Sequence, residues 1–390
     1  MNNKATSRTV FTAGLAIFSM LFGAGNLIYP LYVGMVSGDL NTWGMCGFLL
    51  TAALLPILGF IAMLLFNGDY NSFFNRLGPL VGQILIFLSM LIIGPLIAIP
   101  RITTLSHTMI APFIPFALLQ TITPLSSFIF SLLFLGVTFL GTYRENKIVS
   151  ILGNIVSPLL LFSLSIIIIK GFFSAQMVAH NANGIGAVFR QNAILGYGTL
   201  DLFGALFFSS IVLNILHATH KEYSTKETIH IGIQSGIIGI LLLSLVYWGI
   251  SLLGVYHGHN LAALNPGELF RHISWNVVGA HGAAIIATAV LMACLSTSIA
   301  LSAVVAGYIQ NLFHIDYIHA LSLLILTCIP IATAGLTSVI TLTKVIASAT
   351  YPAIIMLTLC NIGYKLVGFK PVKLPVFIIF IITLLHQAFF

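Results

Sequence analysis

Long apolar segments separated by short polar ones dominate the hydrophobic pattern of the chain. A helix needs about 20 apolar residues to cross the hydrocarbon layer of a bilayer, because each residue adds only about 1.5 Å. By that measure the pattern predicts an all-α integral membrane protein with about eleven transmembrane helices. The predicted spans cover approximately residues 10–35, 43–66, 79–100, 125–142, 148–170, 195–217, 230–256, 282–312, 319–335, 338–364 and 372–389.

The first span contains a stretch that is poorly suited to a continuous helix. From Phe18 to Pro30 it reads FSMLFGAGNLIYP. Glycine loosens the backbone, and proline removes a hydrogen-bond donor and clashes with the preceding turn. A helix break in the middle of the bilayer is tolerated where it lines a cavity. There, free N–H groups bind anions and free carbonyls bind cations. The same residues are also compatible with a kink at a helix contact.

The composition places the chain in the membrane class. Of its 390 residues, 59% are hydrophobic and 6% are charged, whereas a soluble domain carries about 25% charged residues. The net charge of +7 comes from basic residues scattered at segment ends, which does not indicate nucleic-acid binding. The four cysteines lie in apolar segments without metal or disulfide spacing. We therefore expect a single transmembrane domain surrounded by lipid, with no cofactor and no obligate protein partner.

Lysine and arginine indicate the orientation, because cytoplasmic connections are richer in them. With the N-terminus inside, the inner connections hold ten of the fifteen basic residues and the outer connections hold four. This predicts a cytoplasmic N-terminus. In the outer connection 257–281, Asn265, Pro266 and Glu268 suit the cap and first turn of a short surface helix. Such a helix either covers an outer vestibule or lies at the lipid headgroups.

A second interruption occurs in the sixth span, which reads GYGTLDLFGA from Gly196 to Ala205. Spans one and six are five apart, and an odd offset turns the second half upside down relative to the first. Two interrupted helices in inverted halves indicate a transporter binding site. We therefore expect repeats at about 10–170 and 195–364, followed by an extra helix at 372–389, within one transport domain.

Asp201 is the only acidic residue within an apolar span. An acid near the bilayer centre costs roughly 2.5–3.5 kcal/mol, so it usually faces a cavity and has a partner. Three roles are open: counter-ion of a substrate ammonium, ligand or proton carrier for a coupling cation, or structural partner of a basic residue. Arg101 and Lys344 are the basic candidates, and either would close an outer gate by pairing with Asp201. Lys344 has the alternative of extending outward to the interface.

Hydroxyl groups and aromatic rings near the two breaks suggest further parts of a site. A hard cation such as Na⁺ takes several oxygen ligands. Thr297 and Ser298 in the eighth span would supply two if they faced the first break, although Ser and Thr in membrane helices often bond their own backbone. Aromatic residues flank the breaks and would either wall an apolar pocket or simply pack: Tyr29, Phe203, Phe207 and Phe208.

The rival classes are a membrane enzyme and a channel. His217 and His220 end the sixth span three residues apart, which would suit two metal ligands. Only Glu222 lies nearby as an acidic ligand, no nucleophile–base set accompanies the pair, and no ATP-binding loop is present. We therefore predict that the chain is not an enzyme. Saturable uptake that depends on a cation gradient would distinguish a carrier from a channel.

Four motifs resemble those of the bacterial branched-chain amino acid:cation symporters, in order and with similar spacing. They are FGAGNLIYP at 22–30, GPLIAIPR at 94–101, GYGTLD at 196–201 with Gly204-Ala205, and Tyr351-Pro352. The resemblance implies uptake of leucine, isoleucine or valine driven by Na⁺ or H⁺ at the bacterial plasma membrane, and a LeuT-like fold of two inverted five-helix repeats. The alternative is a carrier for another apolar amino acid, such as methionine, or for a different small metabolite.

The same resemblance implies roles for individual residues. The first break would hold the substrate carboxylate, at Ala24, Gly25 and Asn26. The second break would hold the ammonium, at Gly198, Thr199 and Asp201. The resemblance to LeuT-like folds also implies a Na⁺ site built from carbonyls near Ser19 and Phe22 with the hydroxyls of Thr297 and Ser298.

Two departures from the family pattern stand out. Members usually have one span more than the eleven predicted here, although the core of ten remains complete. Lys344 stands where an uncharged residue is expected. A fixed positive charge at that position would weaken the cation dependence or change the choice of substrate.

Overall fold

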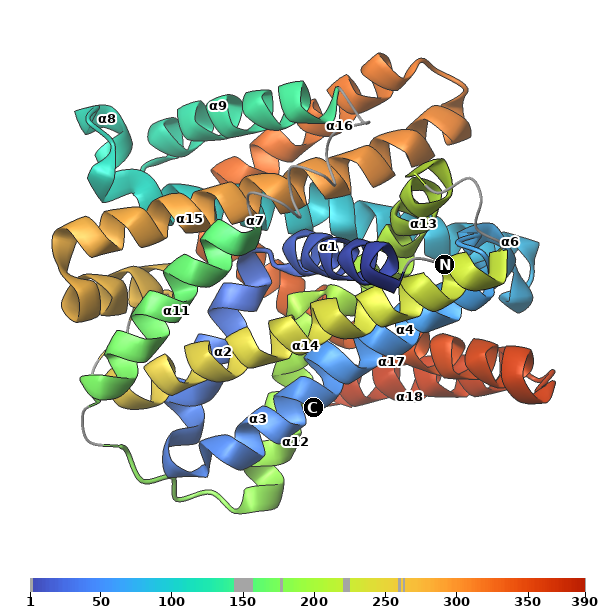
Figure 1. Cartoon of the computed structure of the whole chain (residues 1–390), viewed down its shortest axis with the longest axis horizontal. Coiled ribbons are helices and arrows are strands. Elements are labelled where there is room, and N and C mark those ends of the chain that lie inside the picture. The colour runs from blue at the N-terminus through green and yellow to red at the C-terminus, as the bar shows by residue number, and fades with distance from the viewer. Residues whose placement is uncertain are drawn as a thin grey trace.

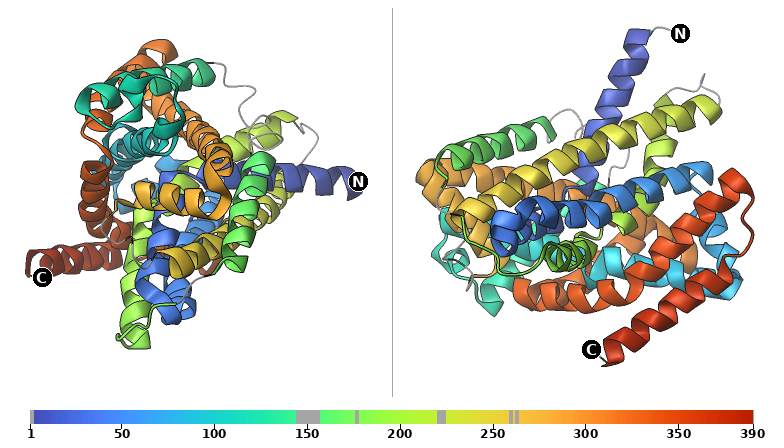
Figure 2. Two further views of the ribbon diagram at one scale, coloured as in Figure 1. Left: turned by 90° about the vertical axis from the view of Figure 1, so that its left-hand side faces the viewer. Right: turned by 90° about the horizontal axis from the view of Figure 1, so that it is seen from below.

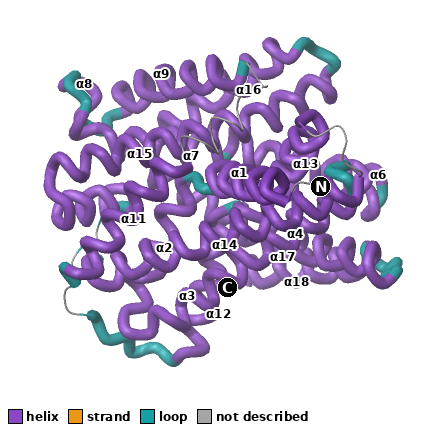
Figure 3. The backbone as a smooth tube through the Cα atoms, viewed as in Figure 1, coloured by secondary structure: helices purple, strands orange, loops and turns teal. Residues whose placement is uncertain are grey.

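The computed structural model describes residues 3–143, 157–175, 178–219, 225–258, 261 and 264–389, and within them every regular element is a helix (Figure 3). The first part of the chain forms α1 (Asn3–Leu21), α2 (Ala24–Ser37), η1 (Gly38–Leu40), α3 (Asn41–Leu49), the π-helical turn η2 (Leu50–Leu54), α4 (Leu55–Leu65), α5 (Tyr70–Phe74) and η3 (Asn75–Leu77). The middle forms α6 (Pro79–Leu91), the π-helical turn η4 (Ile92–Leu96), α7 (Ala98–Ile110), η5 (Ala111–Phe113), α8 (Ala117–Gln120), α9 (Pro124–Thr142) and α11 (Ser157–Phe173). The rest forms α12 (Ile185–Leu195), the 3₁₀ segment η8 (Gly196–Thr199), α13 (Asp201–Thr219), α14 (Thr225–His257), α15 (Pro266–Phe313), α16 (Tyr317–Thr333), α17 (Leu336–Val367) and α18 (Lys373–Phe389).

The described helices follow the predicted spans and confirm an all-α membrane protein. Six of them are long and apolar enough to cross a bilayer, or seven when the bent pair around Leu200 is counted as one span. Shorter apolar helices, including α11, α16 and α18, lie at other predicted spans. The start of the predicted fifth span, with Arg144 and Lys147 before it, lies outside the described residues. The total of eleven spans therefore stays a prediction.

The interrupted helices pack against continuous ones. Helix α14 contacts both α1 and α2, and α4 contacts α13. Figure 1 shows α14 running across α2 and past α1. The approach of α14 to α2 is close enough to require glycine, because a Cβ on Gly34 would lie 1.8 Å from the carbonyl oxygen of Ser251. Small residues at such contacts let two membrane helices approach closely. One long helix thus holds both halves of the first interrupted span.

A second group of helices packs on the other side of the breaks. Helix α15 contacts α7, α9 contacts α16, and these four lie together in the upper part of Figure 1. Helix α18 packs on α17, and its end lies opposite the start of α1 in the left view of Figure 2. The breaks therefore lie between two sets of helices.

The third span extends beyond its predicted end at residue 100. Helix α7 continues to Ile110 and is buried over most of its length. Its polar positions are satisfied locally, because the hydroxyls of Thr103, Ser106 and Thr108 donate to carbonyls four residues earlier at 2.8–3.0 Å. Such back-bonding lets a hydroxyl-rich helix lie within a protein interior. Arg101 therefore lies inside the helical bundle and not at the outer end of the span.

The short surface helix predicted after residue 264 is present as the first part of α15. Asn265 caps it, since its side-chain oxygen accepts from the N–H of Glu268 at 3.0 Å. Gly279, with φ of 74°, separates this part from the long span that follows. Arg271 donates from Nη1 to the carbonyl of Thr108 at 2.9 Å, which attaches the surface helix to the end of α7.

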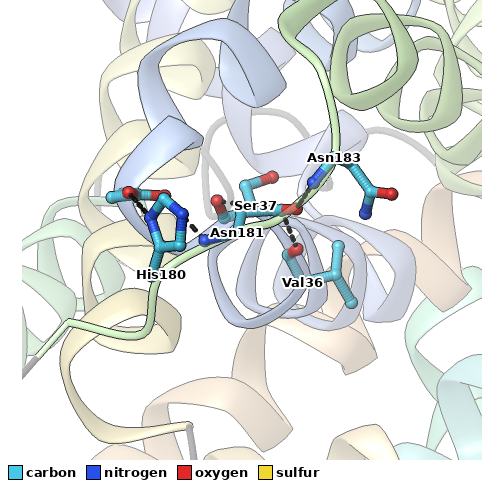
Figure 4. Close-up of polar contacts among 6 residues, drawn as sticks. Val36, Ser37, His180, Asn181 and Asn183 are labelled. Atoms are coloured by element: carbon cyan, nitrogen blue, oxygen red, sulfur yellow. Dashed lines mark hydrogen bonds and ion pairs between the residues drawn. The ribbon is translucent and has the colours of Figure 1, made fainter.

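Two contacts between connections test the predicted sidedness. Figure 4 shows His180 and Asn181 packed at the end of α2, where Asn181 Nδ2 donates to the carbonyls of Val36 and Ser37 at 2.8 and 3.2 Å. On another connection, Arg76 Nη2 donates to the carbonyl of Lys370 at 3.0 Å. Each contact joins two connections that the predicted topology assigns to one side of the membrane.

Candidate functional site

The first break separates α1 from α2 at the predicted position. Helix α1 ends at Leu21, Gly23 is extended with φ of −112° and ψ of −163°, and α2 begins at Ala24. Asn26 completes the turn by accepting the N–H of Gly23 on its side-chain oxygen at 3.0 Å. The first N–H groups of a helix have no acceptor within that helix. The start of α2 therefore offers unpaired donors and the positive end of a helix dipole.

The second break is also confirmed where the sequence predicts it. Segment η8 ends at Thr199, and α13 begins at Asp201 after a bend of 40°. Leu200 between them has a left-handed conformation, with φ of 64° and ψ of 17°. A residue with a Cβ pays roughly 1–2 kcal/mol for this conformation, and such strain persists where the surroundings fix it. Tyr351 on α17 helps to fix it, since its hydroxyl accepts the N–H of Leu202 at 3.0 Å.

A buried polar cluster joins the two breaks. Asn26 Nδ2 lies 2.8 Å from both carboxylate oxygens of Asp201, and the hydroxyl of Tyr247 on α14 donates to Asp201 Oδ2 at 2.5 Å. Asn26 Nδ2 also contacts the Tyr247 hydroxyl. All three side chains are almost completely buried. Tyr247 was not among the residues predicted from the sequence, although a tyrosine in the middle of an apolar span needs a partner for its hydroxyl.

Arg101 occupies the space between the two breaks. Its Nη1 donates to the carbonyl of Gly198 at 2.5 Å and its Nη2 to the carbonyl of Thr199 at 3.1 Å. These carbonyls end a helical segment, and the negative end of a helix dipole stabilises a cation. Its guanidinium carbon lies 5.8 Å from the centre of the Tyr29 ring. Arg101 thus contacts the second break through the backbone, and no ion pair with Asp201 forms among the described residues.

Lys344 does not join this cluster. It is exposed on α17, whereas Asp201 is only 3% exposed. The structure therefore does not form the gate between Lys344 and Asp201 that the sequence suggested. It is compatible with the alternative in which the lysine extends outward.

A small cavity lies at the junction of the two breaks. Its volume is about 30 Å³, which holds about two water molecules and no amino acid. Its lining residues come from both breaks and from η4, α7 and α15: Met20, Leu21, Gly23, Ala24, Asn26, Ile93, Ala98, Arg101, Ile102, Thr199, Leu200, Asp201, Gly204, Phe208, Thr297 and Leu301. This cavity must therefore widen before an amino acid can enter.

The aromatic residues divide between this cavity and the surrounding core. Phe208 lines the cavity. Phe203 packs edge-on against Tyr351 at 5.4 Å between ring centres, and Phe207 stacks on Phe74 at 6.1 Å. In this conformation Phe203 and Phe207 pack in the core outside the cavity, and Phe208 with aliphatic residues forms the apolar part of the cavity wall.

Oxygen atoms gather where α1 ends beside α15. Thr297 Oγ1 lies 3.2 Å from the carbonyl oxygen of Ser19, 3.0 Å from that of Phe22 and 3.2 Å from that of Ala293. A hydroxyl has one proton, so it cannot donate fully to three acceptors. The end of α1 also carries the negative end of its dipole. An all-oxygen set of this kind suits a hard monovalent cation.

Ser298 is turned toward another helix. Its hydroxyl lies 3.2 Å from that of Thr138 on α9. Ser296 is the serine beside the first break, since its hydroxyl lies 3.2 Å from the Ser19 hydroxyl. Of the four residues predicted for a cation, the structure brings Ser19, Phe22 and Thr297 together. The side chain of Ser298 has a different hydrogen-bond partner.

The histidine pair considered for a metal, His217 and His220, falls largely outside the described residues. His220 and Glu222 lie outside the described residues, as does the side chain of His217. Within the described part of the chain, no group of three His, Cys, Asp or Glu side chains is placed to hold a metal ion.

Two interrupted helices that meet at a buried polar cavity define a membrane transporter of the LeuT-like class. Solved structures share this fold. The crystal structure of MhsT in complex with L-phenylalanine aligns with a TM-score of 0.64 at 14% identity, over 97% of this chain and 98% of that one. The Eremococcus coleocola manganese transporter, in complex with an aromatic bis-isothiourea substituted compound, aligns with a TM-score of 0.65 at 14% identity over 97% and 86%. These likenesses establish the fold alone.

Sequence comparison identifies the family. The family described as "Branched-chain amino acid transport protein" matches residues 6–388. The chain is 31% identical over 368 residues to the branched-chain amino acid permease BraB of Bacillus subtilis, covering 92% of this chain and 80% of the relative. It is 29% identical over 380 residues to the permease BrnQ of the same organism, covering 94% and 84%. The chain belongs to the branched-chain amino acid transport protein family, which confirms the resemblance and the prediction that it is not an enzyme.

Proposed function

We propose that the chain is a secondary transporter that imports leucine, isoleucine or valine together with a cation, by alternating access. The observation that carries the proposal is the junction of the two breaks, where Asn26 contacts Asp201 beside one small polar cavity. A transporter needs a central site that both sides of the membrane reach in turn, and interrupted helices provide it. The names of its relatives give the substrate class.

The head group of the amino acid binds at the helix ends. The N–H groups that begin α2, at Ala24 and Gly25, suit a carboxylate because they are unpaired donors at a positive dipole end. The Asp201 carboxylate suits the ammonium because it remains an acceptor beside the cavity. The aliphatic lining and Phe208 suit a branched side chain. The substrate is thus recognised by charge at one end and by apolar contact at the other.

The coupling cation binds beside the substrate. The carbonyls of Ser19 and Phe22 with the hydroxyl of Thr297 would hold Na⁺, and the carboxylate of Asp201 is the alternative carrier if the cation is H⁺. The Ser19–Phe22 turn leads directly into the first break. A cation there would stabilise one arrangement of α1 against α15 and so bias the equilibrium between outward and inward states.

The placement in the cell follows the predicted topology. We assign the chain to the bacterial plasma membrane with a cytoplasmic N-terminus, and its two repeats to about 10–170 and 195–364. The packed connections support this topology, since residues 36–39 contact residues 179–181 and Arg76 contacts Lys370.

One experiment tests the proposal directly. Purified protein in liposomes is given a radiolabelled leucine, with and without a Na⁺ gradient and with and without a pH gradient, and the twenty amino acids are added as competitors. We expect saturable uptake under one gradient, with competition by isoleucine and valine. Competition by methionine alone would assign a different apolar substrate, and uptake that does not saturate would indicate a channel.

A further inference from the structure

The guanidinium of Arg101 is buried beside the cavity and has an unused donor. The residue is 3% exposed, and its Nε has no hydrogen-bond partner among the described residues. Its two Nη atoms are both occupied by the carbonyls of Gly198 and Thr199. A buried donor without an acceptor costs about 1–3 kcal/mol, and more for a charged group. An acceptor reaching the cavity would remove that cost.

A second positive group adjoins the same space. The start of α2 is so close to the guanidinium that a Cβ on Gly25 would lie 2.7 Å from Arg101 Nη2. Ala24, at the first position of α2, lines the cavity together with Arg101. A helix N-terminus and a guanidinium repel one another unless an anion lies between them.

Asp201 does not already serve as that anion. Its carboxylate accepts from Asn26 and Tyr247, and its separation from the guanidinium exceeds ion-pair contact within the described structure. Arg101 therefore contributes charge to the site without a directly bonded carboxylate. The missing partner is an acceptor small enough to fit between two helix ends.

We infer that Arg101 recognises the carboxylate of the substrate, which binds between Arg101 Nε and the N–H groups of Ala24 and Gly25. The inference rests on the proposed function and adds a specificity-determining side chain to it. A guanidinium forms strong, directional hydrogen bonds to a carboxylate. The Nη atoms keep their contacts with Gly198 and Thr199, so the arginine also holds the second break in register with the bound substrate. α-Amino acids are then preferred over amines that lack the carboxylate.

Ligands that differ only in the carboxylate test this inference. Purified protein is equilibrated with radiolabelled leucine at pH 6.5, where the amines are protonated, and leucine or leucinamide is added as competitor. Wild-type protein is compared with R101Q and R101K. The control is R271Q, because Arg271 also donates to a backbone carbonyl but lies on the surface helix at the outer end of α7.

The expected result is a change in the preference between the two ligands. In R101Q the affinity for leucine falls about 10- to 100-fold while that for leucinamide changes less than about threefold. R101K, which retains the charge, recovers part of the preference, and R271Q keeps the wild-type value. Equal losses for both ligands in R101Q would show that Arg101 only braces the helices and would overturn the inference.

Two further outcomes keep the test decisive. If R101Q does not fold, the inference is decided by how much more tightly wild-type protein and R101K bind leucine than leucinamide. A wild-type preference for leucine below about threefold overturns the inference. If wild-type protein fails to bind leucine at all, the proposed function fails instead. The two failures are therefore distinguishable.

Discussion

Asn26 Nδ2 lies 2.8 Å from both carboxylate oxygens of Asp201, although the two residues are 175 positions apart in the chain. Asn26 lies in the first turn of α2, and Asp201 is the first residue of α13. This pair therefore joins the two interrupted helices at their breaks. Both side chains are buried. Any movement that separates the two breaks must therefore replace this contact with another, and a bound amino acid is the natural replacement.

Replacing Asp201 with asparagine should abolish uptake while the protein remains folded. The change removes the charge that we assign to the ammonium and replaces one acceptor oxygen with a donor facing Asn26 Nδ2. Saturable leucine uptake in liposomes, with thermal unfolding as a check on folding, measures the effect. The matched control is Asp316→Asn, because Asp316 has a side chain that is 88% exposed. Near-normal uptake by Asp201→Asn would remove Asp201 from the centre of the site.

Removing the hydroxyl of Tyr247 should weaken the connection between the breaks. In Tyr247→Phe, Asp201 loses one buried donor, which costs about 1–3 kcal/mol. We expect a lower unfolding temperature and leucine affinity reduced about tenfold. Tyr256→Phe on the same helix is the control, because the Tyr256 ring contacts Phe172 at 6.0 Å and not the breaks. Equal effects of the two substitutions would contradict a specific role for the Tyr247 hydroxyl.

A methyl group at residue 25 should block the site. A Cβ in Gly25→Ala would lie 2.7 Å from Arg101 Nη2 and 3.1 Å from Thr199 Cα, so α2 and the second break would have to separate. Overpacking of this kind costs about 1–3 kcal/mol. We expect leucine binding to be lost in a folded protein. Gly307→Ala is the control, because nothing lies within 4 Å of its Cβ and alanine favours the helix there.

The cation dependence should respond to Thr297 more than to Ser298. Thr297→Ala removes the hydroxyl beside the carbonyls of Ser19 and Phe22, so the half-saturating Na⁺ concentration for uptake should rise about tenfold. Ser298→Ala should change it little, because that hydroxyl contacts Thr138. Uptake assayed over a series of Na⁺ concentrations gives both values. An unchanged Na⁺ dependence in Thr297→Ala would exclude this cluster and favour protons or another site.

The contact of Asp39 with the connection at 179–181 should be lost in acid. The N–H of Asn181 donates to Asp39 Oδ1 at 2.9 Å, and this bond, followed by the one from His180, lowers the pKa of the Asp39 carboxyl. Because the folded-state pKa lies below the ordinary value of about 3.9, the contact stabilises the fold above that value. It disappears as the pH falls through the folded-state pKa.

Limited proteolysis of the 178–184 connection measures this contact. Wild-type protein should be protected at pH 7 and become sensitive below about pH 4. Asp39→Asn should be sensitive at both values, since it lacks the charged acceptor. Protection of wild type that is unchanged across this range would contradict the assignment.

The breaks were predictable from sequence because they depend on local chemistry. The residues FGAGN and GYGTLD cannot continue a helix without cost, and the structure interrupts both helices there. The asparagine cap of the surface helix at Asn265 is equally local. In each case the residues that determine the conformation are neighbours in the chain.

The position of Arg101 was not predictable in the same way. The polar residues from Arg101 to Thr108 lower the apolar character of the third span, so its hydropathy predicts an end near residue 100. The helix nevertheless continues, since the hydroxyls bond their own backbone and the guanidinium finds carbonyls about 100 positions later in the chain. Hydropathy measures only the cost of burial and contains no information about such distant partners.

The direction in which each helix face points accounts for the other differences between the predicted site and the structure. Phe203, Phe207 and Phe208 are all apolar and close to the second break, and only the packing of α13 selects Phe208 for the cavity. Likewise, the exposed side of α17 decides the position of Lys344. The rotation of a helix about its axis depends on its neighbours, which the pattern of one segment does not define.

The small volume of the central cavity also affects how easily ions leak down their gradients across the membrane. Protons cross proteins along unbroken files of hydrogen-bonded water, and dissolved ions need a hydrated path. A space of about 30 Å³ holds about two water molecules and leaves no room for an ion with its hydration shell. In this conformation the junction of the two breaks therefore offers a dissolved ion no hydrated path, and a widening that admits the substrate would also be the step that admits the ion.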